Sequence, residues 1–166
     1  PQFAHFYFSS VLSGIEQEAI SHGYTIIVGQ SNEQYDREVL LCQRFYEHKV
    51  CGIIVSQAKD TQKYDHFKKL IDHGVPLIFY DRICTGIDTN RVVVDDYQGA
   101  FNAVSHLIHT GCRHIAYYGS PMTLEISKNR YNGYRDALLK NGLKPEERFF
   151  RICDNRADAE AITPEI

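Results

Sequence analysis

Apolar residues along the chain follow two alternating patterns. In the first, residues such as Val11, Leu12, Ile15 and Ala19 recur every three or four positions, as on the buried face of an α-helix. In the second, apolar residues form short continuous runs such as Tyr24–Val28, which are rich in β-branched side chains and typical of strands covered on both faces. Helical and strand segments alternate with short connections, which predicts an α/β domain with a parallel sheet.

The same reading predicts the remaining elements. After a first helix that ends at His22-Gly23, helices are expected at Tyr35–His48, Tyr64–His73, Tyr97–His109 and Ile126–Lys140. Strands are expected at Tyr24–Val28, Cys51–Val55, Val75–Tyr80, Arg91–Val94, His114–Tyr118 and Phe149–Cys153. The second helix is expected to turn Val39, Leu40, Cys42 and Phe45 inward.

Glycine follows most of these helices directly, at Gly23, Gly74, Gly111 and Gly142. Glycine adopts the left-handed conformation of a helix C-terminus without steric cost, so these residues are expected to end helices. None belongs to a G-x-G-x-x-G or G-x-x-x-x-G-K-[ST] sequence, so no nucleotide fingerprint is present and no cofactor is expected.

Composition and charge narrow the functional classes. The chain has 166 residues, of which 43% are hydrophobic and 23% charged, which are globular proportions. Its net charge of -3 argues against nucleic-acid binding by these residues themselves, because neutralising phosphates needs a basic face. No apolar run approaches the roughly 20 residues of a membrane-spanning helix, so no membrane association is expected.

Five cysteines are spread widely and form no C-x-x-C pair: Cys42, Cys51, Cys84, Cys112 and Cys153. An odd, dispersed set favours free thiols in a reducing cytoplasm over disulfides or a zinc site. The N-terminal residues 1–6 lack the basic start and apolar stretch of a signal peptide, but they also lack an initiator methionine, so a removed signal stays open.

Polar or turn-forming residues follow the predicted strands. They are Gln30-Ser31-Asn32, Ser56-Gln57, Asp81-Arg82, Asp95-Asp96 and Gly119-Ser120-Pro121. In parallel α/β sheets, ligands bind beyond the carboxyl ends of the strands. The clustering therefore predicts a pocket for a polar small molecule at this edge.

Four motifs in order carry a resemblance to a known family. They are FYF…LSGIE at residues 6–16, GVPLIFYDR at 74–82, VVVDDYQGA…HLI…GCRHIA at 92–116, and RYNGYRDAL at 130–138. Together they resemble the effector-binding domain of the lactose-repressor (LacI/GalR) family of bacterial transcription regulators. The third motif is the most specific, because it joins a strand, a capped helix and the next strand with the family's lengths.

The resemblance implies a periplasmic-binding-protein-like fold of two Rossmann-like α/β lobes with parallel sheets. Residues 1–95 would form the N-terminal lobe, without the family's first strand, and residues 96–166 an incomplete C-terminal lobe. The family's helix-turn-helix headpiece and hinge helix have no counterpart among these residues. A small effector, a sugar or related metabolite, would be held between the lobes.

Six residues match the family's ligand-binding positions: Tyr7, Phe8, Ser56, Asp81, Arg82 and Arg130. Carboxylates accept hydrogen bonds from sugar hydroxyls, guanidinium groups donate to them, and aromatic rings pack on the C–H face of a sugar.

Each of these positions has a structural alternative. Asp81 suits a cap or a turn, Arg82 suits a surface ion pair, and Phe8 suits the helix core. Arg130 suits an ion pair with Glu125 or Asp136.

Other chemistry-bearing residues favour structural roles. His106 and His109 lie three apart on a predicted helix without a third ligand, so no metal is expected. Asp95 and Asp96 are expected to cap the following helix. No base accompanies Cys84 in the sequence, so catalysis is not expected.

The resemblance implies a cytoplasmic, ligand-responsive transcription regulator that forms homodimers and binds operator DNA through its headpiece, most simply a repressor. The main alternative is a periplasmic sugar-binding protein of an ABC transporter, which has the same fold and binding cleft. An enzyme with a flavodoxin-like sheet is a third class, disfavoured by the missing phosphate loop.

Overall fold

The computed structural model describes residues 6–153 and 155–165, with the side chain of residue 165 excepted. The chain divides into two compact units, Pro1–Val92 and Val93–Ile166, called lobe 1 and lobe 2 below. The lobe limits at residues 95 and 96 that the family resemblance implies stay a prediction.

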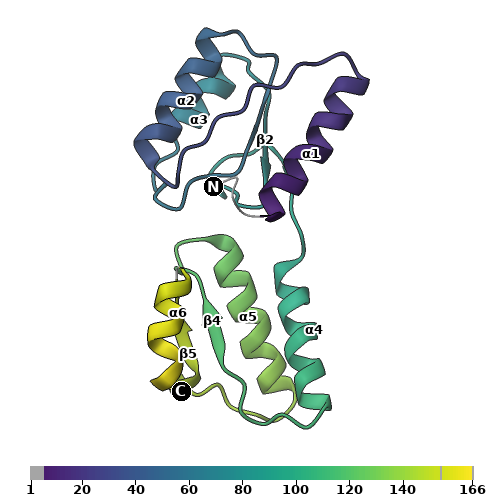
Figure 1. Cartoon of the computed structure of the whole chain (residues 1–166), viewed down its shortest axis with the longest axis vertical. Coiled ribbons are helices and arrows are strands. Elements are labelled where there is room, and N and C mark those ends of the chain that lie inside the picture. Colours follow the sequence, from purple (N-terminus) through teal and green to yellow (C-terminus); the bar gives the residue numbers. More distant parts are fainter. Residues whose placement is uncertain (1–5, 154, 166) are drawn as a thin grey trace. The chain divides into compact units, whose positions relative to one another are not determined.

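Lobe 1 is a three-stranded parallel sheet with helices on both faces. Its elements are α1 (Phe6–Ser21), α2 (Tyr35–Glu47), β1 (Ile53–Val55), α3 (Asp65–Asp72), β2 (Leu77–Tyr80) and β3 (Asn90–Val92). The strand order is β1-β2-β3, and Ile78 of β2 pairs with Ile54 on one side and Asn90 on the other. Figure 1 shows α1 on one side of β2 and α2 and α3 on the other. The parallel α/β architecture predicted from the apolar runs is confirmed.

The core of lobe 1 forms between the sheet and α3. Phe67 of α3 and Phe79 of β2 are almost wholly buried, and their rings meet edge to face with centroids 5.2 Å apart. Cys84 is buried beside them, and Cys42 of α2 belongs to the same cluster. This core holds β1 and β2 in place, so it fixes where their carboxyl ends lie.

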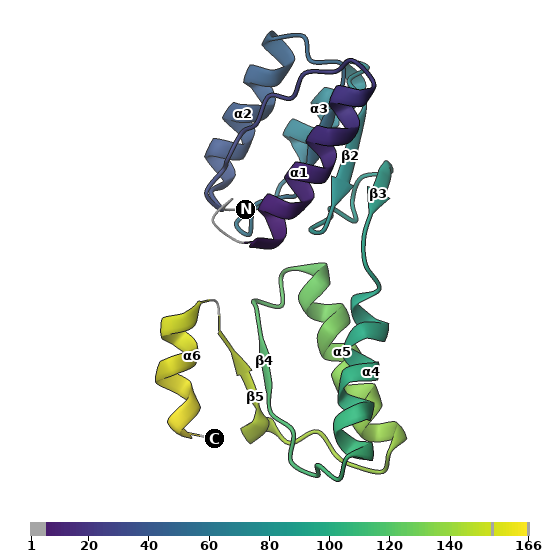
Figure 2. The ribbon, with the colours of Figure 1, turned by 45° about the vertical axis from the view of Figure 1, so that its right-hand side comes forward.

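Lobe 2 pairs two long helices with a two-stranded parallel sheet. Its elements are α4 (Asp96–His109), β4 (Tyr117–Gly119), α5 (Glu125–Lys140), the 3-10 turn η1 (Glu147–Phe149), β5 (Phe150–Ile152), α6 (Arg156–Ile162) and the 3-10 turn η2 (Thr163–Glu165). Figures 1 and 2 both show β4 and β5 between α5 and α6. β4 and β5 are parallel, with Tyr118 opposite Arg151.

The two long helices of lobe 2 touch at Gly133. A Cβ atom at this position would overlap the Tyr97 carbonyl oxygen and lie 2.9 Å from the Phe101 backbone nitrogen. Only glycine allows α5 to approach α4 this closely. Tyr134, next in sequence, is buried and donates a hydrogen bond from its hydroxyl to the Ile115 carbonyl at 2.9 Å.

The predicted helices are confirmed, with ends that differ by one or two residues. The glycines that follow α1, α3, α4 and α5 all have positive φ, from 74° at Gly142 to 103° at Gly111. Their side-chain-free backbone ends the helices as the sequence predicted. α6 was not predicted, because its apolar residues are few and its cap, Asn155, is the main signal.

The strand predicted at Tyr24–Val28 is wrong. The segment is extended, but no described strand pairs with it, and the side chain of Ile27 is 57% exposed. A β-strand requires ladder hydrogen bonds to a neighbour, and a β-branched apolar run supplies only the propensity. Gly29, just after the run, instead lies against Leu41 and Phe45 of α2.

Smaller differences concern register and orientation. The strand predicted at His114–Tyr118 begins three residues later and ends one residue later, as β4, and Val93 and Val94 fall beyond the end of β3. Leu40 was expected inward but is 50% exposed, because the neighbouring Glu38 takes the buried position on α2. Within the described residues, no helix is long and apolar enough to cross a membrane.

Candidate functional site

The carboxyl end of β1 carries buried polar atoms that lack partners. Ser56 and Gln57 follow β1 directly and are both more than nine-tenths buried. Among the described residues, neither the Ser56 hydroxyl nor the Gln57 side-chain carbonyl has a hydrogen-bond partner. Buried polar groups are normally satisfied, so two neighbouring exceptions mark a place where a ligand's hydroxyl groups can complete the bonding.

Arg82, at the carboxyl end of β2, is held by a carboxylate from another part of lobe 1. Its Nη1 atom lies 2.6 Å from Glu33 Oε2, and its side chain is only 13% exposed. The same Glu33 oxygen accepts a hydrogen bond from the Lys59 backbone nitrogen at 3.0 Å. Burial alone would raise the pKa of Glu33, but the Arg82 guanidinium and these hydrogen bonds bring it below its ordinary value.

Three residues at this edge have left-handed backbones. Asn32 and Glu33 have φ of 51° and 64°, and Asp81 has φ of 58°. Positive φ is uncommon for residues other than glycine, and such residues gather where the chain must place a side chain against its preferred geometry. Asp81 lies beside Arg82, with its Oδ2 atom 4.0 Å from Arg82 Nε.

Aromatic rings cover one side of this group. Phe8 is buried, contacts Tyr80 edge to face at 6.3 Å, and lies with its ring centroid 5.8 Å from the Arg82 guanidinium carbon. Tyr7 is 46% exposed and contacts Phe8 at 5.3 Å. Burial and the nearby Asp81 carboxylate raise the pKa of Tyr80, so its hydroxyl stays protonated and can donate a hydrogen bond.

Lobe 2 carries the second candidate arginine, on helix α5. Arg130 of α5 donates from Nε to Asp96 Oδ1 at 2.7 Å, and the arginine side chain is 52% exposed. The alternative partners expected from the sequence are wrong, because Glu125 pairs with Lys128 and Asp136 with Arg135.

A cavity of about 480 Å³ lies beside this pair, within lobe 2. Its lining is Val94, Asp95, Asp96, Gly99, Ala100, Ala103, Val104, Tyr117, Arg130 and Tyr134. Asp95 caps α4 by accepting from the Gln98 backbone nitrogen at 2.9 Å, which confirms its expected role. The volume falls in the range of small-molecule sites, and the polar groups are concentrated around Arg130.

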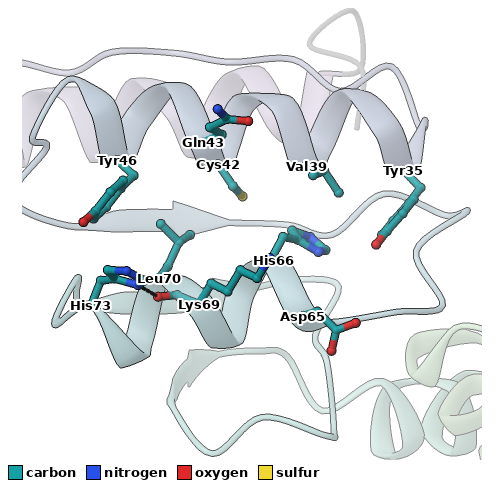
Figure 3. A pocket seen from close by; sticks show the side chains of 10 residues that line it. All are labelled: Tyr35, Val39, Cys42, Gln43, Tyr46, Asp65, His66, Lys69, Leu70 and His73. Carbon is teal, nitrogen blue, oxygen red and sulfur yellow. Dashed lines mark hydrogen bonds between the residues drawn. The ribbon is translucent and has the colours of Figure 1, made fainter.

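Lobe 1 contains a further pocket, of about 420 Å³, between α2 and α3 (Figure 3). His66, on its wall, lies 2.9 Å from Glu38, which is also 2.6 Å from the Ala58 nitrogen and 2.7 Å from the Thr61 hydroxyl. Glu38 and His66 are both buried, so α2 is tied by hydrogen bonds to the loop that follows Ser56 and Gln57. Glu38 thus holds in place the loop that follows Ser56 and Gln57, and it is not itself one of the candidate ligand-binding residues.

The cysteines divide by exposure. Cys42 and Cys84 are buried, Cys51 and Cys112 are exposed, Cys153 is intermediate, and all five are free thiols. Burial, with the nearby Glu38 carboxylate, raises the pKa of Cys42 to about 12, and burial also raises the pKa of Cys84. Across the part of the chain that the structure describes, no three histidine, cysteine or carboxylate side chains form a metal-binding group.

The structure brings five of the six predicted ligand residues together in lobe 1 and places Arg130 in lobe 2. Their roles in binding stay predictions. Two carboxylates were missed, Glu33 and Glu38, because each lies far in sequence from what it holds. A weak signal for Glu33 was present, since it directly follows the polar strand end at Asn32.

Comparison with known proteins assigns the fold to a family. The family described as "Periplasmic binding proteins and sugar binding domain of LacI family" matches residues 1–163. The chain belongs to this family, and the resemblance drawn from the four motifs is confirmed.

Two curated relatives are transcription regulators by name. The chain is 27% identical over 160 residues to catabolite control protein A of Priestia megaterium, covering 96% of this chain and 48% of that protein. It is 28% identical over 161 residues to the HTH-type transcriptional regulator GalR of Escherichia coli strain K12, covering 95% and 46%. The chain therefore spans about half the length of the curated relatives it matches.

Solved structures show the same fold. The complex of the transcriptional regulator CelR with cellobiose superimposes with a TM-score of 0.85 at 22% identity, covering 98% of this chain and 50% of that one. The Cra transcriptional dual regulator of Pseudomonas putida, in complex with fructose 1-phosphate, superimposes with a TM-score of 0.81 at 23% identity, covering 94% and 56%.

Proposed function

We propose that this chain is the sensor part of a sugar-responsive transcription regulator of the LacI family, most simply a repressor. The observation that carries the proposal is the family match over residues 1–163, a family whose description names sugar binding. The names of the two curated relatives favour a regulator over a transporter's binding protein.

The effector contacts residues of both lobes. In lobe 1 these are Ser56, Asp81 and Arg82, with Tyr7 and Phe8 covering the sugar ring. In lobe 2 the contact is Arg130. The unpartnered Ser56 hydroxyl supports this assignment, because a sugar hydroxyl would satisfy it.

The effector shifts the equilibrium between two conformational states, which requires unequal affinity for them. The whole regulator works in the cytoplasm as a homodimer, and a headpiece outside these 166 residues binds operator DNA. The net charge of -3 supports this division, because these residues carry no excess of positive charge for neutralising DNA phosphates.

A thermal-shift screen tests the proposal. Mono- and disaccharides and their monophosphates are added to the protein, to Arg130→Ala and to the control Arg44→Ala, whose arginine lies exposed on α2. A ligand that binds only the folded state raises the melting temperature with concentration. We expect at least one sugar to stabilise the protein and the control. For Arg130→Ala, the same rise in melting temperature should require about tenfold more of that sugar. A panel in which no sugar shifts any of the three proteins would contradict the proposal.

A further inference from the structure

Both arginines of the candidate site are already neutralised by carboxylates of the same lobe. Arg82 lies 2.6 Å from Glu33, and Arg130 lies 2.7 Å from Asp96. A site built for a phosphate or carboxylate keeps its cations available to the ligand. Here an incoming anion would have to displace a carboxylate from each guanidinium and then remain beside it.

Further contacts stabilise the Arg82–Glu33 ion pair. Glu33 is fixed by the Lys59 backbone N–H as well as by Arg82, and its left-handed backbone aims it at both. Its lowered pKa keeps the carboxylate ionised at neutral pH. Asp81 adds a second carboxylate 4.0 Å from the same guanidinium.

The helix N-termini of lobe 2 carry their own acidic residues. Asp95 caps α4, Asp96 lies in its first turn, and Glu125 lies in the first turn of α5. A helix N-terminus attracts anions, but these side chains already complement both helices. α1 has no acidic residue in its first turn, so in lobe 1 the exclusion of a phosphate depends on Glu33 and Asp81.

The hydrogen-bonding capacity of these groups also favours a ligand that carries hydroxyl groups over one that carries a phosphate. Ionised carboxylates only accept hydrogen bonds, and a phosphate dianion also only accepts them. A sugar hydroxyl donates and accepts at once, so neighbouring hydroxyls can donate to a carboxylate while accepting from the arginine paired with it. The unpartnered Gln57 side-chain carbonyl likewise needs a donor.

We propose that the effector is an uncharged polyhydroxy compound, a neutral mono- or disaccharide, and that paired carboxylates in both lobes exclude its phosphorylated counterparts. This inference rests on the proposed function, since it specifies the ligand of the same site. Glu33 in lobe 1 and Asp96 in lobe 2 are the residues that set the selectivity.

Matched ligand pairs test the proposal by calorimetry. The neutral sugar found in the thermal-shift screen is compared with its monophosphate, for example galactose with galactose 1-phosphate or glucose with glucose 6-phosphate. We expect the neutral sugar to bind at least about 30-fold more tightly, because like charges brought together cost several kcal/mol. A phosphate that binds more tightly than the neutral sugar would overturn this inference and leave the sugar sensor intact. Binding of neither class would overturn the proposed function itself.

Variants identify the source of the selectivity. Glu33→Gln removes the charge but keeps the shape, so Arg82 becomes available, and we expect the preference for the neutral sugar to fall below about fivefold. Asp96→Asn makes the same change in lobe 2, where the paired arginine is more exposed and the pair does not support the fold of lobe 1. The control Glu16→Gln, at an exposed position of α1, should keep the full preference. Unchanged preference in both site variants would overturn the role of the carboxylates.

Discussion

The two lobes hold their candidate arginines by different physical means. In lobe 1, carboxylates from distant parts of the chain tie loops together, and Arg82 is 13% exposed. In lobe 2, Gly133 allows two helices to pack closely, while Arg130 is 52% exposed and paired with Asp96. Hydrogen bonds thus define the position of a loop in one lobe, and backbone contact defines the position of a helix in the other.

The difference predicts which substitutions damage each lobe. Lobe 1 should be sensitive to loss of buried acceptors and to low pH. Lobe 2 should be sensitive to volume added between its two long helices.

Glu38→Ala should have the largest effect. The substitution leaves the Ala58 nitrogen, the Thr61 hydroxyl and the His66 ring without an acceptor, at a cost of about 3 kcal/mol in the free energy of unfolding. Hydrogen exchange should show the loss in residues 58–66 of lobe 1 and not in lobe 2. Glu47→Ala, at the exposed end of α2, is the control and should cost less than about 0.5 kcal/mol. Equal losses of unfolding free energy in the two variants would contradict the role of Glu38 as a buried hydrogen-bond acceptor.

Gly133→Ala should come next and act on lobe 2. The new methyl group overlaps the Tyr97 carbonyl oxygen, so α4 and α5 must separate, at about 2 kcal/mol. Gly99→Ala is a matched control on α4, because its Cβ meets no atom within 4 Å. It should stabilise the lobe by about 0.5–1 kcal/mol through helix propensity. Denaturant unfolding of both variants measures the difference, and two values of the same sign would refute the close-contact explanation.

Asp95→Ala should cost about 1 kcal/mol, because the Gln98 backbone nitrogen loses its cap. Asp95→Asn retains a side-chain oxygen and should recover most of the stability. Thermal unfolding of lobe 2 distinguishes the two. If both variants lost the same stability, charge at the helix terminus would matter more than the hydrogen bond.

The smallest effect is a pH dependence in lobe 1. Glu33 has a lowered pKa in the folded protein, so its pairing adds stability above the ordinary carboxyl pKa, and this is lost as pH falls through the folded value. Glu33→Gln should therefore be less stable than the parent at pH 7, by at most about 1 kcal/mol, and this difference in stability should narrow as the pH falls below the ordinary carboxyl pKa. A difference of the same size throughout the acid range would show that shape, and not charge, carries the contribution.

The sequence was sufficient for the architecture, because helices and buried strands leave periodic patterns and glycines mark where helices end. It failed at Tyr24–Val28, where the run has strand propensity but strand formation depends on a neighbour. The prediction also failed at Leu40, since nothing local shows that Glu38, two positions earlier on the same helix, takes the buried place.

For the candidate site, the sequence located strand ends and residue types but not partners. Asp81 and Arg82 were found because they follow a buried strand. Glu33 lies 49 positions before Arg82, and Asp96 lies 34 positions before Arg130. Pairings of this kind follow from tertiary structure and leave no local pattern in the chain.

The division of the cysteines has a practical consequence for spectroscopy. Cys51 lies exposed in lobe 1 and Cys112 lies exposed in lobe 2, while burial protects Cys42 and Cys84 from thiol reagents. With Cys153 replaced by serine, maleimide dyes would label one native position in each lobe. Single-molecule energy transfer between them would then report on the motion of the lobes as an effector is added, without any cysteine being introduced.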